Sequence, residues 1–125
     1  MVLNGLGGPE LSERHAINSA RLMNAAQPDY LSTLVVELPN GTQRFTKHFG
    51  DRWRKLGKLE LFREMEVFLE HLELNSTIFR SDHASNYLVL KGVLGKDKDT
   101  LLQTVRTAIH QPGRIPLREE WQRGL

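Results

Sequence analysis

The sequence predicts an α/β protein in which parallel strands alternate with helices. Short apolar runs at residues 1–3, 30–38 and 77–79 are typical of buried strands, and segments with helical spacing follow each of them. Strands that alternate with helices indicate βαβ units and a parallel sheet. The 125 residues fit one domain. We assign 1–112 to it and expect 113–125 to be a partly ordered tail.

The first strand leads into a glycine-rich turn. Residues 1–3 are apolar, and the turn that follows ends at Pro9. Ser12 is placed to cap a helix, and Glu13 in the first turn suits the helix dipole. Apolar residues then recur at helical spacing, so we predict a helix over 12–26.

The second strand precedes a basic segment. Residues 30–38 contain a continuous apolar stretch, which is typical of a strand covered on both faces in a parallel sheet. Residues 39–42 have the composition of a turn. Residues 44–58 hold six basic residues and one acid, together with Phe45, Phe49 and Trp53. The segment shows no clear period, which indicates a long loop or a short irregular helix.

The strongest helical pattern covers residues 59–74. Its apolar stripe faces a core, and its glutamates are expected to form a solvated face. A third strand is predicted at 77–79, and 87–90 either continues it or begins a short apolar segment. A last helix ends near His110, before Pro112. The glutamates assigned to the solvated face are Glu60, Glu64, Glu66, Glu70 and Glu73.

Composition excludes several classes of chemistry. The chain has no cysteine, which excludes disulfides, zinc thiolate sites, a cysteine nucleophile and a thiolate-bound iron–sulfur cluster within it. A net charge of +2 does not favour nucleic acid as a partner. No apolar run approaches the roughly 20 residues of a membrane span, and residues 1–8 lack the features of a secretory signal. We therefore expect a cytoplasmic protein without a membrane partner.

Ligands of parallel α/β proteins bind beyond the carboxyl ends of the strands. The turn at 5–8 lets the backbone approach an anion at the following helix, although a tight strand–helix turn is the simpler interpretation. Glu37 ends the second strand and either projects into a cleft, which we favour, or pairs with an arginine. Residues 80–86 form the richest polar cluster, in which His83 is either functional or structural.

The basic segment also allows two interpretations. Its mixture of cations and aromatic rings could grip single-stranded nucleic acid. We favour a loop that packs its aromatic rings inward and pairs its cations with the acidic helix that follows.

Several strings of this sequence resemble radical S-adenosylmethionine proteins. They are Asn-Gly-Leu-Gly-Gly at 4–8, Pro-Asp-Tyr at 28–30, Leu-Pro-Asn-Gly-Thr at 38–42 and Phe-Arg-Ser-Asp-His-Ala-Ser-Asn-Tyr-Leu at 79–88. The chain is most similar to uncharacterised Fe–S oxidoreductases with a coproporphyrinogen-oxidase-like (oxygen-independent) or Elongator-like core. The resemblance runs from about residue 3 to 109, and the string around His83 is its most specific part.

The resemblance implies the C-terminal half of a TIM-like (β/α) barrel, with about three parallel strands alternating with three helices. In the family, a Cys-x-x-x-Cys-x-x-Cys loop binds a [4Fe–4S] cluster that cleaves S-adenosylmethionine. This chain lacks those cysteines, so the resemblance implies an enzyme fragment that is inactive alone. It would have no catalytic residue or metal of its own and no cofactor bound to it, and its partner would be the missing N-terminal half.

The same resemblance nominates site residues. Gly5, Leu6, Gly7 and Gly8 would lie along the adenine and ribose of S-adenosylmethionine, and four residues would face the substrate. Half a barrel leaves a sheet edge open, so we expect the isolated chain to form a homodimer. The alternative is a free-standing α/β module that binds an anionic ligand at 5–8 or nucleic acid at 44–58. The substrate-facing nominees are Glu37, Arg80, His83 and Asn86.

Overall fold

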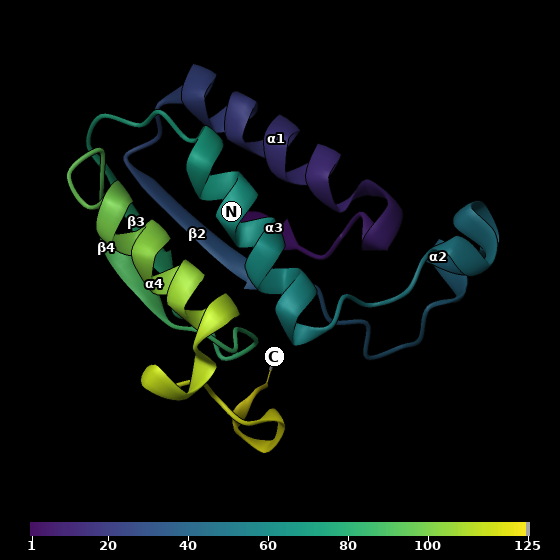
Figure 1. Cartoon of the computed structure of the whole chain (residues 1–125). Coiled ribbons are helices and arrows are strands. Elements are labelled where there is room, and N and C mark those ends of the chain that lie inside the picture. The colour runs from purple at the N-terminus through teal and green to yellow at the C-terminus, as the bar shows by residue number, and fades with distance from the viewer. Residues whose placement is uncertain (125) are drawn as a thin grey trace.

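A computed structural model describes residues 1–124, and it describes every side chain in that range except those at 48, 49 and 51. Within that range a four-stranded sheet has the order β1-β2-β3-β4. Three helices, α1, α3 and α4, lie on one face of the sheet (Figure 1). The strands are β1 (Val2–Asn4), β2 (Tyr30–Val35), β3 (Thr77–Ser81) and β4 (Leu90–Leu94). The helices are α1 (Gly8–Ala26), α2 (Gln43–Phe49), α3 (Lys58–His71) and α4 (Lys98–His110).

The predicted α/β class and its parallel pairing are confirmed, with one addition. β1 pairs with β2 in parallel, and β2 pairs with β3 in parallel. β4 is antiparallel to β3, with Thr77 opposite Leu94 and Ser81 opposite Leu90. The apolar segment expected at 87–90 therefore leads into a separate strand. Only Leu90 and Leu94 of β4 are buried, which left too little alternation to predict it.

The first helix begins earlier than its expected cap. Gly7 is the N-cap and Pro9 lies in the first turn, where its missing N–H costs nothing. The Ser12 hydroxyl instead donates to Glu64 Oε2 at 2.7 Å. The Ser12 side chain therefore joins α1 to α3, and the prediction that it caps α1 is wrong.

The basic segment contains a short irregular helix, as one of the two interpretations expected. α2 is followed by a 3-10 turn at Gly50–Arg52. Trp53 is buried, and its ring stacks on that of Phe45 with centroids 4.5 Å apart. The inward packing expected of Phe49 lies outside the described side chains.

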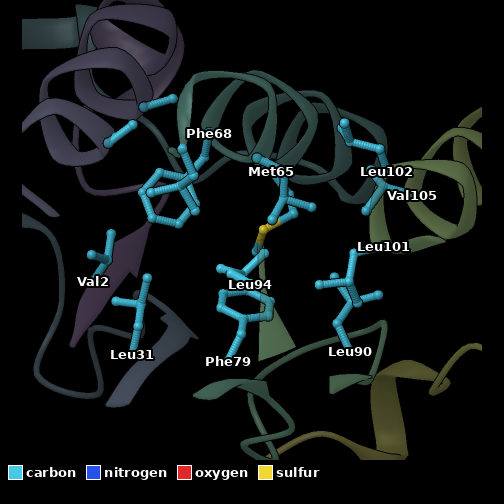
Figure 2. Close-up of a cluster of buried hydrophobic side chains, with 14 of the residues drawn as sticks. Val2, Leu31, Met65, Phe68, Phe79, Leu90, Leu94, Leu101, Leu102 and Val105 are labelled. Atoms are coloured by element: carbon cyan, nitrogen blue, oxygen red, sulfur yellow. The ribbon is translucent and has the colours of Figure 1, made fainter. Parts of the chain in front are cut away.

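α3 is the centre of the core. It packs against α1 on one side and α4 on the other, and all three helices meet the sheet (Figure 1). Phe68 and Met65 of α3 lie above Leu31 and Phe79 of the sheet (Figure 2). Its glutamates do not all face solvent, because Glu64 is only 2% exposed, which corrects the solvated face predicted for it.

The chain after α4 returns to the carboxyl ends of the strands. It contains two 3-10 turns, Pro112–Arg114 and Glu120–Gln122. The Arg118 N–H donates to the Tyr87 carbonyl at 2.8 Å, and the Gly124 N–H to the Ala84 carbonyl at 3.1 Å. This segment thereby becomes one wall of the site described below. Among the described residues, no helix is both long and apolar enough to cross a membrane.

Candidate binding site at the carboxyl edge of the sheet

A cavity of about 120 Å³ lies beyond the carboxyl ends of β1 and β2. This is the edge of a parallel sheet at which ligands are expected. The glycine-rich turn and the chain after β2 form one side, and the C-terminal segment closes the other. Apolar side chains of Val36, Leu56 and Leu61 form part of the wall. The polar lining residues are Glu37, Lys55, Tyr87, Glu120 and Arg123.

Arg123 organises the polar wall. Its side chain is 8% exposed, and its guanidinium lies 3.9 Å from the centre of the Tyr87 ring. Nη2 donates to Glu37 Oε1 at 2.6 Å, and Nη1 donates to Glu120 Oε1 at 2.6 Å. Nε donates to the Ser85 carbonyl at 2.8 Å. A planar guanidinium offers five N–H donors in a fixed plane, whereas an ammonium offers three.

Glu37 bridges two cations. Lys55 Nζ donates to its Oε2 at 2.8 Å, while Arg123 holds its Oε1. The two alternatives for Glu37 therefore hold together: its carboxylate lines the cavity and pairs with an arginine. Two carboxylates and two cations give the wall no net charge.

Tyr87 lies in the loop between β3 and β4 and links this loop to the C-terminal segment. Its hydroxyl donates to Glu120 Oε2 at 2.6 Å. Burial, together with the Glu120 carboxylate, raises the pKa of Tyr87 to about 12. The hydrogen bond from Tyr87 lowers the pKa of Glu120. At neutral pH the phenol therefore stays protonated and the carboxylate stays charged.

The glycine-rich turn binds an anion that belongs to the chain itself. Gly5 has a φ of +85°, and its N–H donates to Glu64 Oε1 at 2.8 Å. The Gly8 N–H donates to the Gly5 carbonyl at 3.1 Å. The Leu6 carbonyl accepts from Trp53 Nε1 at 3.0 Å. These backbone groups already have partners within the fold, as in a tight strand–helix turn.

Glu64 forms a buried polar cluster beneath this turn. Its second oxygen accepts from Ser12, and His15 Nε2 lies 4.0 Å from its Oε1. His15 Nε2 also lies 2.7 Å from the Leu3 carbonyl, which requires a proton on that nitrogen. Burial raises the pKa of Glu64, against the opposing effect of its two hydrogen bonds.

The nominated residues at 80–86 do not converge on one point. Asn86 is buried, and its Nδ2 donates to the Thr33 carbonyl at 3.0 Å, so its amide joins the loop to β2. His83 Nδ1 lies 2.9 Å from Ser85 Oγ and accepts from the Ser85 N–H at 3.1 Å. Arg80 lies on the face of the sheet that the helices leave open. Of the four substrate-facing nominees, only Glu37 lines the cavity of about 120 Å³.

Sequence reasoning missed most of the polar wall. Tyr87 was assigned only to an apolar segment, and Glu120 and Arg123 lie in a tail for which no role was predicted. Tyr-Leu-Val-Leu at 87–90 looks apolar, and nothing local shows that Arg123 meets Glu37, 86 residues away in the sequence. An arginine and a glutamate three residues apart are frequent on solvated surfaces, so they carried no signal.

Three cations of the basic segment pair with carboxylates within the fold. Arg54 Nη1 donates to Glu60 Oε1 at 2.8 Å, and Arg52 Nη1 lies 3.4 Å from Glu10 Oε1. Lys55 binds Glu37, as described above. These contacts agree with the interpretation that the segment folds inward.

The described part of the chain supplies no metal centre. No group of three or more His, Asp or Glu residues in it could hold a metal ion, and the sequence has no cysteine. An iron–sulfur cluster therefore does not fit this chain alone. For S-adenosylmethionine, the N–H groups of Gly5 and Gly8 already have partners within the fold, while the side chain of Leu6 is exposed at the turn.

Comparisons of the chain with protein-family models, with curated proteins and with solved structures give no match. Function therefore has to be inferred from the residues and geometry above.

Proposed function

We propose that this chain is the C-terminal half of a β/α barrel and completes a radical S-adenosylmethionine Fe–S oxidoreductase. One observation carries the proposal: β1, β2 and β3 are parallel neighbours in chain order. In doubly wound folds the strand order reverses and helices cover both faces. In β/α barrels the strands follow one another and all helices lie outside. The order of β1, β2 and β3 and the helices on one face agree with this arrangement, whereas the antiparallel β4 departs from it (Figure 1).

The open face of the sheet supports a barrel. Tyr30, Ile78 and Val93 are 57%, 41% and 38% exposed on the face opposite the helices. Large apolar side chains in a row on a sheet face are normally covered. In a completed barrel this face would line the interior.

The free edge of β1 supports a preceding β/α unit. Two adjoining surface grooves, of about 550 and 240 Å³, run beside β1 and α1 and share Leu6, His15, Ser19 and Leu22. Leu22 is 64% exposed and Leu6 is 36% exposed. A preceding strand on the edge of β1, with its helix against α1, would cover these side chains and satisfy the edge.

The activity we propose for the completed enzyme is reductive cleavage of S-adenosylmethionine, followed by hydrogen abstraction from a substrate not yet known. The resemblance of residues 4–8 and 79–88 to the family supports this activity. The present chain would contribute the carboxyl edge of its strands, where the cavity with Glu37 and Arg123 lies, and the missing half would supply all cluster ligands. Alone it is expected to be inactive.

Reconstitution tests the proposal. The chain is joined to an N-terminal half that carries Cys-x-x-x-Cys-x-x-Cys, supplied with iron, sulfide and a reductant, and assayed for 5′-deoxyadenosine. We expect product from the joined protein and none from residues 1–125 alone. A joined protein that assembles its cluster and never cleaves the cofactor would contradict the proposal.

The alternative proposal is a free-standing module for an anionic ligand or nucleic acid. It has less support, because the N–H groups of Gly5 and Gly8 and the cations Arg54 and Lys55 already have partners in the fold. Steeply salt-dependent binding of a single-stranded oligonucleotide would favour this alternative.

A further inference from the structure

We propose that the open face of the sheet binds an organic anion, a carboxylate or phosphate attached to an apolar body. The proposal rests on the proposed function in one respect, because that face is the interior only in a completed barrel. It names the class of substrate that such an interior would accept.

Strand register places three hydrogen-bond donors in one row. Ser32 on β2 lies opposite Arg80 on β3, and Arg80 lies opposite Lys91 on β4. Neighbouring side chains of a strand point to opposite faces, and Phe79 and Ser81 on either side of Arg80 are buried beneath the helices. Arg80 and its two neighbours therefore lie on the open face.

Arg80 has spare hydrogen-bonding capacity. Among the described residues, its one hydrogen bond goes to the Phe79 carbonyl, at 3.1 Å from Nη1. A guanidinium carries five N–H donors. Lys91 Nζ lies 3.8 Å from Asp82 Oδ2 in an exposed pair. Exposed pairs of this kind are weak and easily exchanged for another anion.

Apolar residues flank the donor row on both sides. Tyr30, Ile78 and Val93 form the next row toward the amino ends of β2 and β3, and the register pairs them across the three strands. Leu3 and Leu34 are paired on the other side, where Asp82, which follows β3 and pairs with Lys91, also lies. A guanidinium between apolar rows matches a planar or tetrahedral oxyanion on an apolar molecule. The apolar rows make the phosphate backbone of a nucleic acid a poor match.

A dye with the same chemistry tests the site. The probe 8-anilinonaphthalene-1-sulfonate joins an anion to aromatic rings and is titrated into dilute isolated chain. We expect Arg80→Gln to weaken its binding about tenfold, the effect of losing a charge-assisted hydrogen bond. The matched control is Arg21→Gln, an exposed arginine of α1, which should leave binding unchanged. Equal affinity in Arg80→Gln and wild type would overturn the proposal.

A neutral probe separates an anion site from a merely apolar face. N-phenyl-1-naphthylamine lacks the sulfonate, so Arg80→Gln should leave its binding within about twofold. Phenyl phosphate and 3-phenylpropionate should displace the sulfonate dye, whereas 3-phenylpropanol should not, and their relative strengths distinguish phosphate from carboxylate. Equal displacement by the alcohol would overturn the site. Lys91→Gln is a second variant for the case that Arg80→Gln lowers the folded population. We expect it to weaken binding of the sulfonate dye.

Failure here is distinguishable from failure of the proposed function. The dye-binding experiments need only the isolated chain. If Arg80→Gln binds the dye as tightly as wild type, the anion site is excluded even if the joined enzyme cleaves S-adenosylmethionine. Conversely, if the joined enzyme does not cleave S-adenosylmethionine, the measured dye binding still stands. Only the conclusion that the site lies inside a barrel is then lost.

Discussion

Glu64 is the residue on which the glycine-rich turn depends. A carboxylate buried at 2% exposure is costly unless it is hydrogen-bonded. Here the Gly5 N–H and the Ser12 hydroxyl supply the two hydrogen bonds, so α3 is tied to both β1 and α1. The turn that resembles a ligand loop therefore already holds an anion.

The first prediction concerns Glu64 and pH. Burial holds the folded pKa of Glu64 above its unfolded value, so its stabilising contribution is complete below the unfolded pKa and is lost as pH rises through the folded pKa. The difference in free energy of unfolding between wild type and Glu64→Gln should therefore be larger at pH 4.5 than at pH 7.5, by urea denaturation.

Two controls isolate this effect. The matched control is Glu13→Gln, the same substitution at an exposed position of α1. A His15→Gln background removes the imidazole that lies beside Glu64. A difference for Glu64→Gln that grows as pH rises would contradict the assignment.

For single residues, the sequence identified some of the side chains at the site but not their hydrogen-bond partners. It singled out Gly5 and Glu37, and both line the cavity. It placed Glu64 on a solvated face because five glutamates at nearby positions look alike in sequence. Which one of them turns inward depends on Ser12, 52 residues away, and no local pattern encodes that contact.

Two elements position the site, namely the C-terminal segment and the start of α3. The segment after α4 contributes Arg123 and Glu120 to the polar wall, and it is held by backbone bonds to Tyr87 and Ala84. It therefore acts as a strap across the carboxyl edge of the sheet.

The second prediction tests this strap. Arg123→Ala removes hydrogen bonds to Glu37, Glu120, Tyr87 and the Ser85 carbonyl. It leaves Glu37 half-buried with Lys55 alone, so we expect a loss of about 2 kcal/mol in the free energy of unfolding. The matched control is Arg114→Ala in the same segment, whose side chain donates to the Gln111 side chain, and it should cost less than about 0.5 kcal/mol. Equal losses would contradict the account.

The third prediction concerns the start of α3. Arg54 binds both oxygens of Glu60, and the Gly57 N–H also donates to this carboxylate; Arg54 is the largest influence that lowers the pKa of Glu60 to about 2. Because the folded pKa is lowered, the contribution of Glu60 to stability is present above its unfolded pKa and is lost as pH falls toward 2.

Carbon-detected NMR titration checks this value. In Arg54→Gln the pKa of Glu60 should rise toward the ordinary value of about 4.3. Arg63→Gln should raise it less, because the charge of Arg63 lowers the pKa of Glu60 less than Arg54 does. Unchanged titration in Arg54→Gln would show that the ion pair does not form in solution.

Helices with strong apolar stripes were predictable, and elements defined by distant contacts were not. α3 and α4 follow the 3.6-residue period closely, so their existence and approximate ends were visible in the sequence. β4 is recognised as a strand only from its pairing with β3. The strap is recognised only from the contacts of Arg123. Both depend on tertiary contacts.

In the described part of the molecule, the edge of β1 is free and the groove along α1 lies beside it. The expected homodimer would cover them in the isolated chain, and a preceding β/α unit would cover the same surface in a completed barrel. The two occupants should therefore exclude one another.

The fourth prediction follows from that shared surface. Leu22→Lys, in the groove beside β1, should shift the isolated chain from dimer to monomer in sedimentation equilibrium. Val93→Lys, at an apolar position of the open sheet face that is 38% exposed against 64% for Leu22, should leave the dimer intact. A chain that is monomeric at all concentrations, or a dimer broken by Val93→Lys alone, would contradict the use of the β1 edge.

The central claim is that this chain completes a barrel whose cluster-binding half precedes it. The most direct test is to read the DNA upstream of the Met1 codon in the source organism. The account predicts an in-frame extension that encodes strands, helices and Cys-x-x-x-Cys-x-x-Cys. An in-frame stop codon there, with no neighbouring gene that encodes a cysteine-bearing partner, would contradict it.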